Sequence, residues 1–181
     1  MEMRAPFLVG ERLSLRPLDV QDLERCLRWI NDPEILQFLG RRRPMSREME
    51  TAWLAAQYKD ERQINFAITL NEGDRHIGNC GLDMLDTANR SACFGILIGE
   101  KDAWSQGYGS EAARLVLGYG FQQLNLHRIE LEVFSLNHRA IRAYEKLGFV
   151  HEGVKRESYF RNGAFHDTLV MGLLESEWRD G

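Results

Sequence analysis

The feature that most constrains the fold is a glycine-containing turn at residues 104–112, Trp-Ser-Gln-Gly-Tyr-Gly-Ser-Glu-Ala, which runs directly into an apolar helical pattern. Gly107 and Gly109 lack a Cβ atom, so the backbone can adopt unusual dihedral angles here and approach a ligand closely. Amide N–H groups point outward at the start of the following helix, where the helix dipole adds partial positive charge. The turn therefore predicts an anion site that suits a phosphate. A tight strand-to-helix turn without a ligand gives the same short pattern.

The residues before this turn predict antiparallel strands. Residues 65–70, 76–85 and 91–98 are strand-like and are separated by turn-forming residues, which is the pattern of consecutive hairpins. A first short strand is expected at residues 13–17. A dinucleotide-binding domain is excluded, because its glycine turn follows the first strand of a βαβ unit and not three antiparallel strands.

Helices are predicted both before and after these strands. Residues 20–30 have helical spacing behind the N-cap Asp19, and a second helix begins at Ser46. Residues 109–124 and 137–147 predict two further helices.

Further strands are expected at residues 129–134, 149–160 and 168–174. The alternation of strands and helices implies neighbouring parallel strands joined by crossover helices. We expect a single domain over residues 1–181, of the mixed α/β (α+β) class, with a mostly antiparallel central sheet flanked by helices.

Composition narrows the class of protein. The formal net charge of −4 and a pI near 5.8 disfavour a broad nucleic-acid-binding face. The one dense basic run, Arg41-Arg42-Arg43, is either a solvated loop or a ligand contact. The five histidines show no metal-ligand spacing with one another or with the cysteines, so we expect no metal site.

The cysteines and the N-terminal residues indicate a compartment. Cys26, Cys80 and Cys93 are odd in number and widely spaced, which suits free thiols in a reducing environment. No signal-peptide pattern and no apolar run of membrane-spanning length is present in the sequence. We therefore expect a soluble, cytoplasmic protein without a membrane partner.

A second motif lies about thirty residues after the glycine turn. Residues 137–149 read Asn-His-Arg-Ala-Ile-Arg-Ala-Tyr-Glu-Lys-Leu-Gly-Phe and follow an apolar strand. Together with Gln106-Gly107-Tyr108-Gly109, this segment resembles the two signature motifs of the GCN5-related N-acetyltransferase (GNAT) superfamily. The sequence from Arg12 to Trp178 is similar to the RimJ/RimL branch, which includes ribosomal-protein N-terminal acetyltransferases and spermidine acetyltransferases.

This resemblance implies that acetyl-CoA is the cosubstrate and that the glycine turn binds its pyrophosphate. The residues implied are Gln106, Gly107, Tyr108, Gly109, Ser110 and Glu111. Glu111 departs from the glycine or alanine that many members carry there. The pantetheine arm is expected to pair with Leu97, Ile98 and Gly99, and Arg139 and Arg142 are candidates for contacts with the coenzyme A phosphates.

Tyr144 matches the position of the general acid in the family, and Asn137 matches a residue that contacts the cofactor arm or orders water. Each also has a structural explanation, since Asn137 is a good helix N-cap and Tyr144 can fill an apolar face. The general base stays unassigned. Cys93 falls at or next to the position of a glutamate in some relatives, and Glu130 or Glu132 can act through water or simply lie at the surface.

The resemblance also implies that the early helices wall the acceptor site, so that Trp29, Asn31 and Asp32 either face substrate or serve as a core residue and helix caps. A protein α-amine, with a pKa of about 7.7 to 8.0, needs a base less than a lysine-like amine of pKa about 10.4. The missing carboxylate therefore favours a protein N-terminus as acceptor.

The alternatives are a small amine, namely spermidine, an amino sugar or an antibiotic, and a non-catalytic acyl-CoA sensor. Polyamine binding would need carboxylates around the cleft, and the candidates are Asp32, Glu34, Asp83 and Asp86. A homodimer is an expectation from relatives alone.

Overall fold

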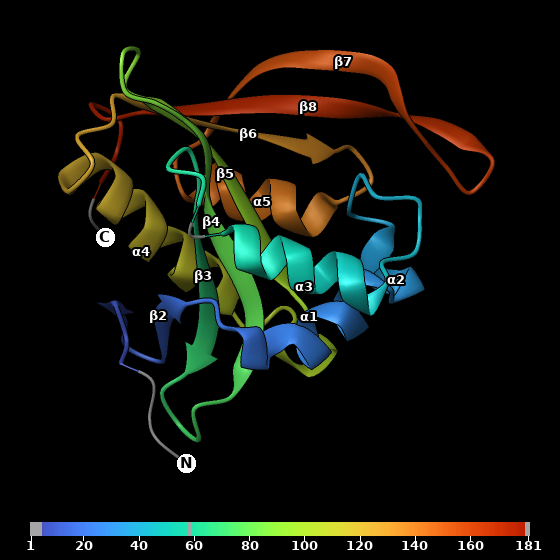
Figure 1. The fold of residues 1–181 in the computed structure, drawn as a ribbon. Coiled ribbons are helices and arrows are strands. Elements are labelled where there is room, and N and C mark those ends of the chain that lie inside the picture. The colour runs from blue at the N-terminus through green and yellow to red at the C-terminus, as the bar shows by residue number, and fades with distance from the viewer. Residues whose placement is uncertain (1–4, 58, 180–181) are drawn as a thin grey trace.

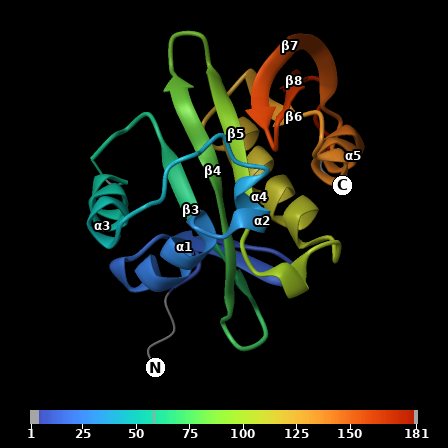
Figure 2. The ribbon, with the colours of Figure 1, turned by 90° about the vertical axis from the view of Figure 1, so that its right-hand side faces the viewer.

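The structure is a computed structural model that describes residues 5–57 and 59–179. One eight-stranded sheet, in the order β1-β2-β3-β4-β5-β6-β8-β7, forms its centre. Figures 1 and 2 show helices α1 and α3 on one face of this sheet and α4 and α5 on the other. Within the described residues, no helix is both long and apolar enough to cross a membrane.

The first part of the chain supplies one edge of the sheet and a helical layer. Its elements are β1 (Leu8–Val9), β2 (Leu13–Pro17), the 3-10 turn η1 (Val20–Asp22), α1 (Leu23–Ile30), α2 (Pro33–Leu36) and α3 (Arg47–Ala56). Asp19 caps η1 through a capping box, and the Ser46 hydroxyl accepts a hydrogen bond from the Met49 amide at 3.2 Å. Both predicted helix starts are therefore confirmed.

The remaining elements build the rest of the sheet and its second helical layer. They are β3 (Ile64–Leu70), β4 (His76–Asp86), β5 (Ser91–Ile98), η2 (Lys101–Ala103), α4 (Tyr108–Gln122), β6 (Arg128–Phe134), α5 (His138–Lys146), β7 (Val150–Arg161) and β8 (Ala164–Leu174). Strands β2 to β5 pair antiparallel in sequence order, and the prediction of three consecutive antiparallel strands is confirmed for β3, β4 and β5.

Strands β5 and β6 form a parallel pair that is unusually short. Ser91, Ala92 and Cys93 pair with Arg128, Ile129 and Glu130, and no further pairing joins the two strands, both of which lie within the described part of the chain. Beyond this point β6 continues to pair with β8 on its other side. The two strands therefore part in the middle of the sheet.

The prediction of neighbouring parallel strands holds for β5 and β6 but is wrong for β6 and β7, because β8 lies between them. The reason is burial. Met171 and Leu173 of β8 are fully buried, whereas nearly every side chain of β7 is exposed except that of Tyr159. The more apolar strand takes the interior position and the polar strand takes the edge.

Two hydrophobic cores lie on opposite faces of the sheet. The larger one joins α4 and α5 to the sheet through residues such as Val116, Leu117 and Ile129. The smaller one packs Cys26, Trp29, Ile35 and Leu54 of α1 to α3 against the other face. The early helices are thus fixed to the sheet by a core of their own.

A buried ionic cluster anchors this smaller layer. Arg16 donates two hydrogen bonds of 2.8 Å to Asp22, and both side chains are almost fully buried. His76 Nδ1 lies 3.3 Å from Asp22, and its Nε2 lies 2.8 Å from the Asn79 side-chain oxygen. Burial acts to raise the pKa of Asp22, but the hydrogen bonds from Arg16, together with the close approach of His76, outweigh it and hold this pKa well below its usual range.

Asp22→Asn should destabilise the protein by about 3–5 kcal/mol, because it leaves the buried Arg16 guanidinium without its counter-charge. Urea denaturation at pH 7 measures this change. The control is Glu24→Gln, which removes the exposed partner of Arg47 and should leave the free energy of unfolding almost unchanged. Equal losses in the two variants would show that the buried pair is not an anchor.

Candidate active site

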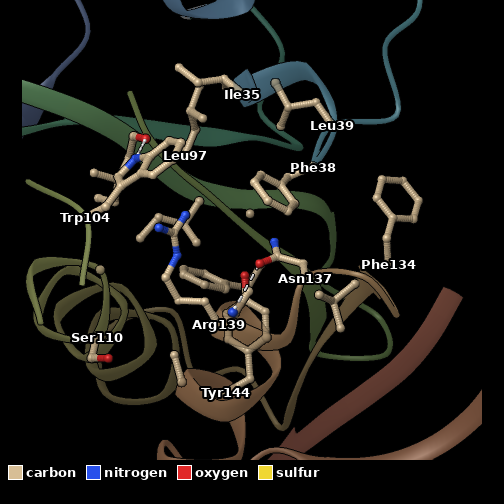
Figure 3. A pocket seen from close by; sticks show the side chains of 18 of the residues that line it. Ile35, Phe38, Leu39, Leu97, Trp104, Ser110, Phe134, Asn137, Arg139 and Tyr144 are labelled. Carbon is tan, nitrogen blue, oxygen red and sulfur yellow. Dashed lines mark hydrogen bonds between the residues drawn. The ribbon is translucent and has the colours of Figure 1, made fainter. Parts of the chain in front are cut away.

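A cavity of about 400 Å³ opens where β5 and β6 part. Figure 3 shows that α5 contributes one wall and that the segment following α2 faces it across the opening. The glycine turn before α4 closes the end of the cavity. The residues that the sequence singled out on β5, α4 and α5 are therefore brought to one place by the divergence of two strands.

The β5 wall presents backbone as well as side chains. Leu97 and Ile98 line the cavity, on the strand edge that β6 leaves unpaired in the described part of the sheet. Gly99 does not line the cavity, and its amide donates to the Ile77 carbonyl at 2.9 Å. A Cβ atom at Gly99 would sit 2.0 Å from the Trp29 ring, so this glycine serves packing. Of the three residues predicted for the pantetheine arm, Leu97 and Ile98 line the cavity and Gly99 does not.

The glycine turn has the geometry of an anion site. Gly107 is the N-cap of α4 and has a φ of 84°, a left-handed conformation that favours glycine. Gly107, Gly109 and Ser110 all line the cavity. Because a glycine N-cap offers no side chain to the first amides of this 15-residue helix, those N–H groups are available to an anion.

Arg12 holds this turn in place and was not predicted. Its backbone amide and its Nε each donate to the Glu111 carboxylate at 2.8 Å, and its Nη1 donates to the Gln106 carbonyl at 3.0 Å. The guanidinium also lies 4.8 Å from the centre of the Tyr108 ring. Gln106, Tyr108 and Glu111 thus fix the loop through Arg12 and do not line the cavity. This role explains the departure at Glu111.

The α5 wall carries the predicted catalytic residues. Asn137 lines the cavity and also caps α5, since its side-chain oxygen accepts from the Ala140 amide at 3.2 Å, so both of its suggested roles are compatible. Tyr144 lies in the cavity with its ring edge-on to Phe94 at 6.3 Å. Burial raises the pKa of Tyr144 to about 12, so its phenol remains a proton donor at neutral pH.

The two arginines of α5 differ in position. Arg139 reaches across the cavity, with its guanidinium 4.3 Å from the Trp104 ring centre and 6.0 Å from that of Phe38 (Figure 3). Arg142 is exposed and does not line the cavity. Only Arg139 is therefore placed to contact a ligand there.

The residues considered for the acceptor side lie outside the cavity. Trp29 is buried in the smaller core, and its Nε1 donates to Glu100 at 3.0 Å. Asn31 bonds to the backbone of Leu27 and Met45, and Asp32 caps α2 and pairs with Lys101 at 2.9 Å. All three have the structural role that was the alternative to substrate contact.

The early helical layer still walls the cavity, but through the segment after α2. Phe38, Leu39 and Gly40 supply this wall. Tyr159 of β7 fixes it, since its hydroxyl donates to the Leu39 carbonyl at 3.2 Å and its ring stacks on Phe134 at 3.6 Å. No local sequence signal connects Tyr159 to a segment 120 residues earlier.

Glu132 is the one carboxylate among the described residues that line the cavity, and Lys155 donates to it. Cys93 is not part of the lining, and burial, with the charge of Glu130 nearby, raises the pKa of its thiol to about 11. The neighbouring Glu130 pairs with Arg128 at 2.9 Å outside the lining. The strand alternation that placed Glu130 and Glu132 on one face did not show which of them reaches the opening.

The four carboxylates suggested for a polyamine do not converge on this cavity. Asp32 and Glu34 both pair with Lys101, at 2.9 and 2.7 Å. Asp83 and Asp86 line a different hollow, near the turn between β4 and β5. The described residues also contain no cluster of three or more His, Cys, Asp or Glu side chains able to hold a metal ion.

Comparison with known proteins identifies the family. Residues 12–150 match the acetyltransferase (GNAT) domain. The chain belongs to this family. It is 32% identical over 174 residues, 94% of this chain and 97% of the other, to the uncharacterised N-acetyltransferase p20 of Bacillus licheniformis. YdaF of Bacillus subtilis, which bears the provisional name of ribosomal N-acetyltransferase, is 30% identical over 94% of this chain and 95% of its own.

A solved structure extends the likeness to a cofactor complex. Spermidine N-acetyltransferase from Vibrio cholerae, in complex with CoA and spermine, superposes with a TM-score of 0.86 and 29% identity, over 92% of this chain and 97% of that one. The GNAT chain described here is thus an acetyl-CoA-dependent N-acetyltransferase with a mixed, mostly antiparallel sheet.

Arg12→Ala should raise the KM for acetyl-CoA by about three- to tenfold and change kcat little, because it releases the turn without touching the reacting atoms. Steady-state kinetics measure both constants. Arg114→Ala, an exposed arginine further along α4, is the control. A fall in kcat with an unchanged KM would contradict a loop-holding role.

Proposed function

We propose that this enzyme belongs to the RimJ/RimL branch and acetylates the N-terminal α-amine of a protein in the cytoplasm. The observation that carries the proposal is the make-up of the cavity wall at Phe38, Leu39, Gly40 and Phe134, which is apolar and aromatic. Among the described residues of the lining, Glu132 is the one carboxylate. A polyamine presents several cations and calls for several carboxylates. A peptide α-amine presents one cation, with a pKa of about 7.7 to 8.0, so one base is enough.

In this proposal, the coenzyme A pyrophosphate binds the first amides of α4, where Gly107, Gly109 and Ser110 line the cavity. The pantetheine arm lies between β5 and β6 and pairs with backbone groups at Leu97 and Ile98, on the edge that β6 leaves unpaired and where the Ile98 carbonyl also accepts from Trp104 Nε1 at 2.8 Å. An amide donor at this edge points at the thioester oxygen and stabilises the negative charge that develops on it. Asn137 orients the arm, and Arg139 contacts the cofactor phosphates.

Three proton transfers complete the chemistry. Glu132 accepts a proton from the acceptor ammonium, directly or through water, and the neutral amine attacks the thioester carbon. The tetrahedral intermediate collapses with cleavage of the C–S bond, and the Tyr144 phenol donates to the departing sulfur. The nitrogen releases its second proton through water to the Tyr144 phenolate, which restores the phenol. The products are an N-acetyl peptide and free coenzyme A.

A second candidate acceptor is a polyamine, because the Vibrio cholerae neighbour is a spermidine N-acetyltransferase bound to spermine. Thiol release from acetyl-CoA, with N-terminal peptides, spermidine, amino sugars and aminoglycosides as acceptors, separates the candidates. Turnover with peptides supports the proposal, and turnover with spermidine alone overturns it. Tight cofactor binding without turnover on any acceptor would indicate a sensor.

Tyr144→Phe should lower kcat by about 10²-fold and leave the Kd for acetyl-CoA unchanged, since it removes the proton donor and keeps the ring. Because burial raises the pKa of Tyr144 to about 12, wild-type kcat should show no falling limb from this group up to about pH 10. Tyr119→Phe in α4 is the matched control. Equal kcat values for wild type and Tyr144→Phe would show that Tyr144 is not the general acid.

Glu132→Gln should lower kcat/KM by about 10²-fold at neutral pH, with partial recovery at high pH, where the acceptor amine loses its proton without help. A pH profile of kcat/KM with a peptide acceptor measures this effect. Glu130→Gln, two residues earlier on the same face of β6, should stay near wild type. An equal loss in both variants would assign the effect to strand stability.

A further inference from the structure

The arginine run at residues 41–43 divides into an inward and an outward part. Arg41 turns inward, where its Nη2 donates to the Met45 sulfur at 3.2 Å and its charge acts on the buried Glu50. Arg42 and Arg43 are exposed. Arg41 therefore has a structural role, and the other two arginines are left to face solvent.

Arg42 lies behind the part of the cavity wall that Phe134 forms, on the far side of Tyr159. Its guanidinium is 5.8 Å from the ring centre of Tyr159, and Tyr159 stacks on Phe134 at 3.6 Å. Phe134 lines the cavity, as do Phe38 and Leu39 (Figure 3). An acceptor chain that leaves the cavity past Phe134 and Gly40 would next meet Arg42.

Arg42 and Arg43 have no acidic partner among the ion pairs of the described residues. Glu132, the carboxylate of the cavity lining, is paired with Lys155. Although the net charge of the chain is −4, two exposed arginines without an ion-pair partner therefore follow shortly after the cavity-lining Gly40. Exposed arginines contribute little to stability. Beside a cavity, however, they attract ligands of opposite charge, so the position of Arg42 near the opening gives it a role in binding.

We infer that the acceptor is a peptide whose N-terminal segment is acidic, with Arg42 and Arg43 recognising carboxylates downstream of the reacting amine. This inference rests on the proposed function and adds the class of peptide. The Arg42 guanidinium lies 5.8 Å from the ring centre of Tyr159, which lies 3.6 Å from that of Phe134 in the cavity wall. An extended chain covers these two distances in about three residues at ~3.3 Å each. The acidic residues are therefore expected at about the third and fourth positions.

The test uses peptides that are identical except at positions 3 and 4, which carry Asp, Asn or Lys. For wild type, kcat/KM should be about tenfold higher for the Asp peptide than for the Lys peptide, and the preference should shrink as salt is added. Arg42→Glu should abolish or reverse the preference. Arg25→Glu, a charge reversal at an exposed position of α1 outside the cavity lining, should preserve it.

The outcomes separate this inference from the proposed function. Acetylation of all three peptides at the same rate, or a preference that survives Arg42→Glu, overturns the acidic-peptide inference and leaves peptide acetylation standing. Acetylation of none of them, with turnover of spermidine, overturns the proposed function and this inference together.

Discussion

The parting of β5 and β6 after three paired positions is the constraint on which the site depends. A strand in the middle of a sheet normally satisfies its N–H and C=O groups on both edges. Here β4 satisfies one edge of β5, and the other faces a cavity lined by Leu97 and Ile98. A ligand with its own amide groups can complete this edge, which is the reason for proposing that the pantetheine arm binds there.

The other walls are fixed by contacts from distant parts of the chain. Arg12, just before β2, holds the glycine turn through Glu111, and Tyr159 of β7 holds the segment after α2 against Phe134. The buried Arg16–Asp22 pair locks the early helical layer to the sheet. Each wall is thus set by packing outside the cavity, which leaves the lining residues free for chemistry.

Local patterns in the sequence predict most of the elements and part of the site. Hairpin turns, the caps at Asp19 and Ser46, and the glycine turn are local signals, and the structure agrees with each of them. The insertion of β8 between β6 and β7, the Arg12–Glu111 pair and the reach of Glu132 into the cavity depend on contacts between distant residues. Gly99 shows the same limit, because its neighbour Trp29 is seventy residues earlier.

Hydrogen exchange measured with and without acetyl-CoA tests whether the cofactor binds in the gap between β5 and β6. We expect slower exchange within residues 95–98, at the amides of β5 that face away from β4, and at residues 107–110, where the first N–H groups of α4 lack an intrahelical partner. Exchange in the hairpin between β7 and β8 should stay unchanged. Protection confined to other segments, with β5 unaffected, would contradict the claim that the gap between β5 and β6 is the acetyl-CoA site.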